Sequence, residues 1–487
     1  MTSPAELEKI PAGVGRPDYD RSTLDVGIVH IGVGGFHRSH QAMYLDRLLS
    51  DGLARDWAIC GVGLLPGDAR MREVMRAQDC AYTLLLKHPD GHEQARVIGS
   101  IVEYLFAPDD PAAVVERMAD PRVRIVSLTI TEGGYNINQV TGEFDAQASS
   151  VLEDLARPEA PRTAFGLVVE ALRVRRERGV PPFTVLSCDN VQGNGEVARR
   201  VFAGYAALRD PELGRFVREQ VSFPNSMVDR ITPQTTAEDR AELAERYGVD
   251  DGWPVVAEPF AQWVIEDDFP AGRPPWEQAG AQLVEDVMPY ELMKLRLLNA
   301  SHQAMSYFGY LMGHRYAHEA ASDRLLTRLL RRYWDQEAIP TLRPVPGIDL
   351  AGYTDTLLER YRNPAIRDTL ARLCAESSDR IPKFLLPVAF EQIAAGRRVP
   401  LSAAVVASWA RYAEGVDEQG EPIDVVDGRR DQVMAAARPQ EDPVAFLRDP
   451  QLFGDLVHDE AFVADYLCAL DLLHTVGAEA TLEALLR

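Results

Sequence analysis

The chain has 487 residues, of which 46% are hydrophobic, so it is long enough for two domains with separate cores. Its net charge of −23 at pH 7 would repel a phosphate backbone, so we expect no nucleic-acid partner. It contains no run of about 18 apolar residues and begins without a basic segment followed by an apolar one. We therefore expect a cytoplasmic protein without a membrane span, and its five scattered cysteines indicate reduced thiols.

The first half of the chain alternates predicted strands with predicted helices. A compact apolar run over 26–33 predicts a buried strand of the parallel type, and a helix follows over 41–49. Further strands are predicted over 57–64, 82–87, 95–104, 124–130 and 183–188, and further helices over 163–178 and 196–207. This alternation predicts an α/β fold, with a parallel sheet covered by helices on both faces. Ligands of such folds bind at the carboxyl ends of the strands.

Beyond about residue 285 the pattern becomes helical. Helices are predicted over 290–313, 319–337, 351–361, 365–376, 382–396, 401–414 and 462–486. We therefore expect two domains: a dinucleotide-binding α/β domain over 1–285 and a mainly α-helical substrate and catalytic domain over 286–487.

A glycine-rich turn follows the first predicted strand. Its residues are Gly32, Val33, Gly34, Gly35, Phe36, His37 and Arg38. Small residues here let the backbone approach a pyrophosphate at the N-terminus of the next helix, where free N–H groups favour anions. The turn departs from the usual GxGxxG pattern, because His37 occupies the third glycine position. The sequence favours dinucleotide binding over the alternative, a tight turn that binds nothing.

Two further polar positions follow predicted strands. Asp68 lies after the second strand, where an acid would bind the adenosine ribose of NAD, although a surface aspartate in a turn is a comparable alternative. Arg70 nearby could instead favour the 2′-phosphate of NADP. Asn190 follows the strand over 183–188 and can donate to a substrate oxygen, or else cap the next helix.

The predicted helix over 290–313 carries three polar residues within an apolar pattern: Lys294, Asn299 and His302. On an α-helix they fall at roughly 0°, 140° and 80°, so they share one broad face. Lysines on helices are normally solvated, but Lys294 is flanked by leucines and methionine, and partial burial would favour the neutral amine, a usable base. Taken alone, His302 could equally be a satisfied core histidine.

A metal site is not expected. His37 and His40 are three residues apart, but no acidic residue or cysteine lies near them in the sequence to complete a ligand set.

With these motifs assembled, the chain closely resembles the polyol-specific long-chain dehydrogenases, the mannitol 2-dehydrogenase family, over essentially its full length. The resemblance rests on the segments 30–40, 131–136, 187–195, 223–233 and 294–302. It implies a Rossmann-type domain followed by a helical domain, NAD as the cofactor, no metal and a monomer. It also implies the interconversion of a polyol and a ketose.

The resemblance further implies a role for individual residues. Lys294 would be the catalytic base, Asn190 and Asn299 would bind the reacting oxygen, and His302 would orient the substrate. Three other residues would contact distal hydroxyls: Asp229, Arg372 and Arg380. Glu291 could relay protons to solvent or be an ordinary acid at a helix N-terminus.

Several substrates remain open at this stage. D-Mannitol and D-fructose are the first expectation, followed by D-arabinitol or sorbitol, and then a uronate such as fructuronate. A uronate would need an additional cation in the site, which Arg372 or Arg380 could supply. An alternative of another class is a nicotinamide-sensing protein without catalysis, although a sensor has no need for the set of Lys294, Asn299 and His302.

Overall fold

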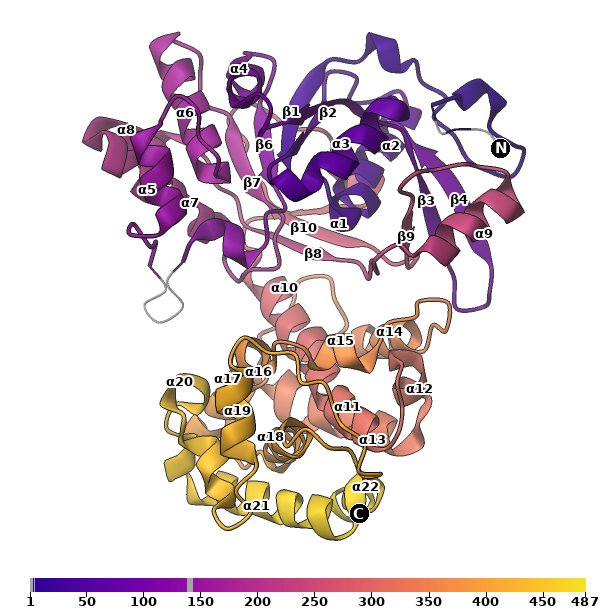
Figure 1. Cartoon of the computed structure of the whole chain (residues 1–487), viewed down its shortest axis with the longest axis vertical. Helices are drawn as coiled ribbons and strands as arrows, with labels where there is room; N and C mark the ends of the chain where they lie inside the picture. Colours follow the sequence, from indigo (N-terminus) through magenta and orange to yellow (C-terminus); the bar gives the residue numbers. More distant parts are fainter. Residues whose placement is uncertain (1–2, 4, 138–142) are drawn as a thin grey trace. The chain divides into compact units, whose positions relative to one another are not determined.

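A computed structural model describes residues 3, 5–137 and 143–487 of the chain and divides it into two compact units, Met1–Val287 and Met288–Arg487. In the first unit, five parallel strands form a sheet in the order β5-β2-β1-β6-β7 (Figure 1). Their bounds are Val26–Ile31 (β1), Ala58–Gly63 (β2), Ile101–Phe106 (β5), Ile125–Leu128 (β6) and Thr184–Ser187 (β7). This sheet confirms the predicted Rossmann-type fold.

Helices cover both faces of this sheet, because successive side chains of a strand point to opposite faces. Val29 and Ile31 of β1 pack into a core with helices α4, α6 and α7, whereas Ile28 packs into a second core with α2 and α3. The helices of the unit are Gly35–Ser39 (α1), Gln41–Ser50 (α2), Ala69–Ala77 (α3), Pro111–Ala119 (α4), Ser149–Ala156 (α5), Ala164–Glu177 (α6), Asn194–Arg209 (α7), Pro211–Gln220 (α8) and Ala237–Tyr247 (α9).

Two three-stranded sheets complete the first unit, with the orders β4-β3-β9 and β11-β10-β8. Their strands are Tyr82–Lys87 (β3), Glu93–Ile98 (β4), Ser226–Asp229 (β8), Val255–Ala257 (β9), Gln262–Glu266 (β10) and Gln282–Val284 (β11). β3 and β4 pair as an antiparallel hairpin.

The prediction of one strand over 95–104 is wrong. β4 ends at Ile98 and pairs with β3, whereas β5 begins at Ile101 and pairs with β2 of the parallel sheet. The chain changes sheets at Gly99, whose N–H donates to Asp46 and where a Cβ would lie 2.7 Å from the Pro17 ring. This close approach, which requires glycine, separates the two strands.

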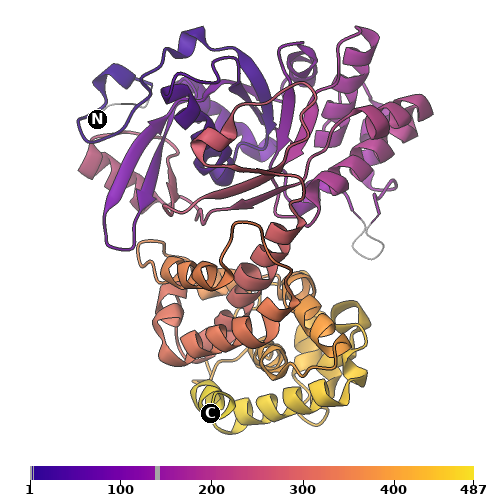
Figure 2. The same ribbon diagram turned by 180° about the vertical axis from the view of Figure 1, so that it is seen from behind.

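The secondary-structure elements described in the second unit are all helical, which confirms the expected helical C-terminal domain (Figure 2). They are Met288–Met293 (α10), Ala300–Leu311 (α11), Ala317–Ser322 (α12), Arg324–Arg332 (α13), Leu350–Tyr361 (α14), Leu370–Cys374 (α15), Ser377–Phe384 (α16), Leu386–Ala394 (α17), Pro400–Ala413 (α18), Arg430–Ala437 (α19), Pro450–Phe453 (α20), Glu460–Thr475 (α21) and Gly477–Leu485 (α22). α11 is the central element and contacts α13, α15 and α18.

Two π-helical turns interrupt this pattern. The first π turn is Lys294–Asn299, between α10 and α11, and the second π turn is Tyr333–Ala338, after α13. The single α-helix predicted over 290–313 is therefore wrong at its centre, and the helix predicted over 365–376 is reduced to α15.

Side-chain caps explain where several helices begin. Thr163 accepts a hydrogen bond from the backbone of α6, Asp349 from that of α14 and Asp459 from that of α21. Each cap satisfies an N–H group that has no partner within its own helix.

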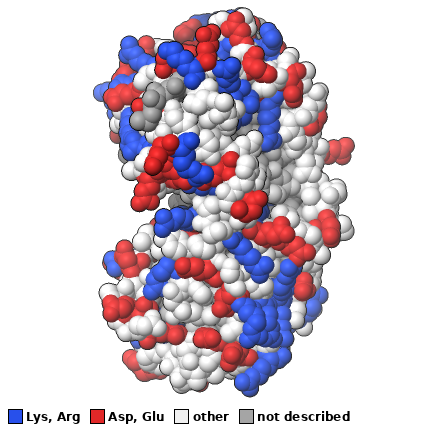
Figure 3. Space-filling model, turned by 90° about the vertical axis from the view of Figure 1, so that its right-hand side faces the viewer, with Lys and Arg blue, Asp and Glu red and all other residues white. Residues whose placement is uncertain are grey.

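None of the described helices is both long and apolar enough to cross a membrane. Acidic and basic side chains are interspersed over the face shown in Figure 3, and basic side chains gather at one edge of the second unit.

Candidate functional site

The glycine-rich turn lies at the carboxyl end of β1. Gly32 has φ +97°, and a Cβ at this position would lie 2.1 Å from the carbonyl oxygen of Thr129, so a side chain cannot be accommodated. By contrast, a Cβ at Gly34 would meet no atom closer than 4.0 Å, and Gly34 is the N-cap of α1. The turn therefore leaves its backbone open to a ligand where helical N–H groups begin.

The side chains that follow this turn point into the first unit. The ring of His37 is fully buried and stacked on His30, with 3.4 Å between the ring centroids, and burial holds the pKa of His37 well below its usual value. Arg38 is also buried and donates to the carbonyl oxygen of Trp253 at 2.5 Å. A cofactor role for His37 or Arg38 would therefore rest on backbone N–H groups. Val33 is buried as well, and Phe36 is half-buried.

Asp68 lies just beyond the carboxyl end of β2. Its Oδ2 atom accepts hydrogen bonds from the backbone N–H groups of Leu64, at 2.9 Å, and Leu65, at 2.8 Å. These bonds hold the half-buried carboxylate at the position where dinucleotide-binding sheets carry the acid that binds ribose. The guanidinium of Arg70 lies over the ring of Trp253, 4.8 Å from its centroid.

The ends of β6 and β7 are joined by a buried carboxylate. Asp189 accepts hydrogen bonds from the Tyr135 hydroxyl at 2.6 Å and from the backbone N–H of Thr131 at 2.7 Å. Burial is the largest effect on this carboxyl and raises its pKa above the ordinary value. Asp189 is a further functional candidate, and its place after a strand and beside Asn190 is the signal for it in the sequence.

Asn190 is exposed next to this carboxylate. It does not cap the following helix, because α7 begins at Asn194 with Gly193 as its N-cap. Asn194 has a structural role, since its amide donates hydrogen bonds to the carbonyl oxygens of Asp189 and Ser226. Asp229, at the end of β8, is buried opposite Gln262 of β10.

In the second unit, Lys294 and Asn299 are the first and last residues of the first π turn. Lys294 is 7% exposed, and Glu291, one turn earlier in α10, is also buried. The N–H of Ala300 donates to the carbonyl of Leu295, five residues back, so residues five apart approach the same side of the helix. The 140° separation predicted for Lys294 and Asn299 on an α-helix is therefore wrong. Among the described residues, the buried Oδ1 atom of Asn299 has no hydrogen-bond partner.

His302 follows in α11. Its ring packs against that of Tyr361, with 4.7 Å between centroids, and burial lowers the pKa of His302 to about 3. Four charged side chains have a smaller effect on this pKa: Asp368 raises it, and Arg372, Arg360 and Arg380 lower it. The structure thus brings three predicted residues together: His302, Arg372 and Arg380.

The two predicted arginines are held by nearby groups. Arg372 forms a two-bond ion pair with Asp368, with distances of 2.6 and 2.5 Å, and Arg380 donates to the carbonyl oxygens of Arg372 and Leu373. Three residues near His302 were not predicted from the sequence: Arg360, Tyr361 and Asp368. The predicted helix that ends at residue 361 shows no pattern that indicates proximity to His302.

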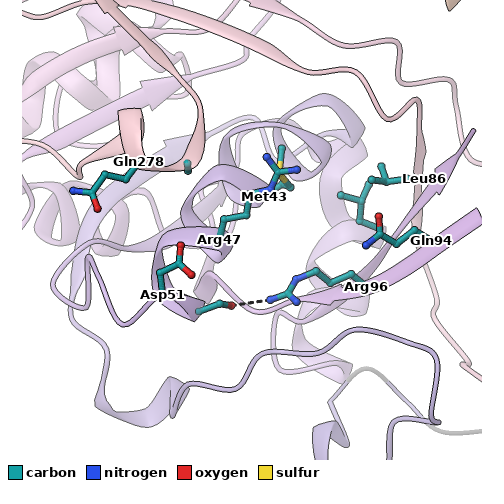
Figure 4. A pocket seen from close by; sticks show the side chains of 10 residues that line it. Met43, Arg47, Asp51, Leu86, Gln94, Arg96 and Gln278 are labelled. Atoms are coloured by element: carbon teal, nitrogen blue, oxygen red, sulfur yellow. Dashed lines mark hydrogen bonds between the residues drawn. The ribbon is translucent and has the colours of Figure 1, made fainter.

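A pocket with a volume of about 360 Å³ lies elsewhere, in the first unit (Figure 4). Its lining includes Arg47 and Arg96, and Arg96 donates to Ser50 at 2.8 Å. No residue predicted for the site lines this pocket. Within the described part of the chain, no group of three or more His, Cys, Asp or Glu residues is placed to bind a metal ion.

Both units match domains of a known protein family. Residues 26–278 match the mannitol dehydrogenase Rossmann domain, and residues 286–473 match the mannitol dehydrogenase C-terminal domain.

Individual relatives are similar over nearly the whole chain. Mannitol 2-dehydrogenase of Phaeosphaeria nodorum is 46% identical, and the match covers 96% of this chain and 82% of that protein. Mannitol dehydrogenase DSF1 of Saccharomyces cerevisiae is 44% identical, with 96% and 94% covered.

Two solved structures are similar in fold as well as sequence. The ternary complex of Pseudomonas fluorescens mannitol 2-dehydrogenase with NAD and D-mannitol has a TM-score of 0.91 and 44% identity, and covers 100% of this chain and 99% of that one. A substrate-free D-sorbitol dehydrogenase also has a TM-score of 0.91, with 41% identity and 99% and 100% covered. The chain therefore belongs to the mannitol dehydrogenase family of polyol-specific long-chain dehydrogenases.

Proposed function

We propose that this protein catalyses the NAD-dependent oxidation of D-mannitol to D-fructose and the reverse reduction. The family supports a polyol dehydrogenase, and the 44% identical enzyme from Pseudomonas fluorescens was solved with NAD and D-mannitol bound. The observation that carries the chemistry is the first π turn, which holds a buried amine, Lys294, five residues before the amide of Asn299.

The first unit offers a fitting site for NAD. Gly34 leaves room for a pyrophosphate beside the backbone, and Asp68 is held by two N–H groups where a ribose hydroxyl could donate to it. We assign the cofactor to Gly32, Gly34, Gly35 and Asp68, with Val33, Phe36, His37 and Arg38 completing the turn.

In the proposed mechanism, neutral Lys294 accepts the proton of the reacting hydroxyl through its Nζ atom. NAD bound in the first unit would supply the acceptor for the hydride that leaves the same carbon. The substrate oxygen gains negative charge as its proton leaves, and the amides of Asn190 and Asn299 donate hydrogen bonds to it, as in an oxyanion hole. Ketose reduction follows the same path in reverse, with the ammonium of Lys294 as the acid.

The remaining residues select the substrate. His302 is neutral at neutral pH, because burial lowers its pKa to about 3, so it can exchange a hydrogen bond with a hydroxyl without carrying charge. We assign contacts with distal hydroxyls to Asp229, Arg372 and Arg380.

A second candidate is D-sorbitol, since one of the two solved structures described above is a D-sorbitol dehydrogenase. The test is the rate of NADH formation with D-mannitol, D-sorbitol and D-arabinitol, and of NADH consumption with D-fructose and fructuronate. We expect the highest kcat/KM with D-mannitol and D-fructose. Nicotinamide binding without turnover of any of these compounds would contradict the proposal and favour a sensor.

Three further parts of the proposal are tested separately. Activity with NAD should exceed that with NADP and should survive treatment with a chelator. The mass in solution, measured by light scattering, should be that of a monomer.

A further inference from the structure

Aromatic side chains donate hydrogen bonds to backbone carbonyls of the first π turn. In an α-helix each carbonyl accepts from the N–H four residues later, and a π turn shifts this pairing to five, so carbonyls near the turn lose their regular partner. Three successive carbonyl oxygens of the first π turn accept hydrogen bonds from aromatic side chains, and that of Leu298 also accepts from the Ser301 hydroxyl at 2.9 Å. The donors are the Tyr333 hydroxyl to Arg296 at 3.3 Å, the Trp334 indole to Leu297 at 2.9 Å and the Tyr361 hydroxyl to Leu298 at 3.1 Å.

These donors are themselves held in place. Tyr333 and Trp334 are fully buried and begin the second π turn, so the two π turns are hydrogen-bonded to each other. Glu337, in the same second π turn, accepts from the backbone N–H groups of Leu401 and Ser402 at the start of α18. The second π turn is thereby anchored to a long helix.

Tyr361 has a double contact with the same region. Its hydroxyl bonds both the Leu298 carbonyl and the Ser301 hydroxyl, the latter at 2.9 Å, while its ring packs on His302. Its place at the end of α14 therefore links the first π turn to the histidine that follows.

We propose that Tyr333, Trp334 and Tyr361 form an aromatic clamp whose task is to hold the first π turn, and with it the relative placement of Lys294 and Asn299. This rests on the proposed function of those two residues. Without the clamp the segment is free to rewind as an α-helix, in which Lys294 and Asn299 would point about 140° apart. The clamp residues are positioning residues, because their hydrogen bonds reach the backbone of the turn.

Ordinary core packing is the alternative, since buried Trp and Tyr side chains normally find a hydrogen-bond partner. Packing alone does not require that three donors from two separate helical segments meet three consecutive carbonyls between Lys294 and Asn299. The test must therefore remove the donor atoms while keeping an aromatic ring at each position.

Trp334→Phe and Tyr361→Phe remove these donors, and the second unit offers a matched control for each. Trp409→Phe changes an equally buried tryptophan that packs on Phe446 and Phe453. Tyr466→Phe removes a buried hydroxyl that donates to the carbonyl of Pro443 at 3.1 Å. The four variants differ mainly in whether the lost donor served the first π turn.

The first measurement is amide hydrogen exchange of a peptide that covers residues 294–301, which requires no activity. We expect exchange there to become about five to ten times faster in Trp334→Phe and Tyr361→Phe, as loss of one hydrogen bond implies. In Trp409→Phe and Tyr466→Phe it should stay at the wild-type rate. Unchanged exchange in both clamp variants would overturn the proposal.

The second measurement is steady-state kinetics with D-mannitol. A misplaced base lowers the rate of the chemical step by up to about 100-fold, so kcat should fall in the clamp variants while KM changes little. The alkaline rise of kcat/KM should also move to higher pH, because water that reaches a loosened turn favours the charged amine. Equal losses in clamp and control variants, in step with their melting temperatures, would show a merely structural role and overturn the proposal.

The two measurements separate this inference from the proposed function. If the wild type turns over no polyol, the proposed function fails, and the exchange data still report whether the clamp holds the turn. If the wild type is active and the clamp variants retain its kcat and pH profile, the proposed function stands and the positioning role fails.

Discussion

The imidazole of His302 packs against the phenol ring of Tyr361, with 4.7 Å between their centroids, in a site where burial lowers the histidine pKa to about 3. His302 is therefore neutral throughout the neutral and alkaline range. We expect the pH profile of kcat/KM in the wild type to show no step near pH 6.5 that arises from this residue. A step that is present in the wild type and absent in His302→Asn would contradict this assignment.

Replacement of Lys294 should nearly abolish turnover. For Lys294→Ala we expect kcat to fall by about 10²–10⁴, the range typical of a lost general base, while NADH still binds. Lys383→Ala is a matched control, because Lys383 is a partly exposed lysine of the same unit, paired with Asp379 at 2.6 Å. Its kcat should stay at the wild-type value. Retention of more than about a tenth of wild-type kcat in Lys294→Ala would rule out the base assignment.

The pH dependence gives an independent check of the same residue. Oxidation of D-mannitol requires a neutral amine, so kcat/KM should rise from neutral to alkaline pH. A stopped-flow or steady-state series over this range would reveal the rise, and a flat profile would argue against a lysine base.

Asn190 and its neighbour Asn194 should respond differently to the same substitution. Asn190→Ala should lower kcat by about 10²–10³, as loss of one oxyanion-hole donor does, with little change in melting temperature because the side chain is exposed. Asn194→Ala should instead lower stability, since it removes hydrogen bonds to Asp189 and Ser226. If Asn190→Ala were both stable and fully active, Asn190 would have no role in the mechanism.

Asp68 should govern the choice between NAD and NADP. Asp68→Ala should raise KM for NAD and increase the relative rate with NADP, because the ribose acceptor is lost. Asp109→Ala serves as the control, since Asp109 is an exposed partner of Arg72 and should leave both cofactors unaffected. An unchanged ratio of kcat/KM values for the two cofactors in Asp68→Ala would show that this carboxylate does not contact the ribose.

Buried histidine should make the protein sensitive to mild acid. Burial lowers the pKa of His30 from 6.5 to about 3, so between these pH values the unfolded chain binds the proton and the folded chain does not. Its contribution to the free energy of unfolding is therefore present above about pH 6.5 and lost as the pH falls, by up to about 2 kcal/mol at pH 5.

Urea unfolding at pH 7, 6 and 5 measures this loss. His30→Asn should show a smaller loss of stability on acidification than the wild type, whereas His92→Asn, at an exposed position, should show the wild-type loss. Identical pH dependence in His30→Asn and the wild type would contradict the role of His30.

Two expectations from the sequence failed because in each case the local pattern is that of one continuous element. The run over 95–104 satisfies the pattern of one strand, and the break at Gly99 follows from contacts with Asp46 and Pro17 that lie far away in the sequence. The segment over 290–313 satisfies the pattern of one α-helix, because a π turn needs no glycine or proline and leaves the local composition unchanged.

The sequence by itself determined the alternation of strands and helices, the glycine-rich turn after β1 and the set of Lys294, Asn299 and His302. These depend on short-range patterns of hydrophobicity and backbone preference. Only the tertiary structure decided that His37 and Arg38 point inward and that Lys294 and Asn299 are one π turn apart. The physical reason is that these features depend on contacts between residues far apart in the sequence: Trp334 and Tyr361, for example, reach carbonyls of the first π turn only when the whole unit is folded.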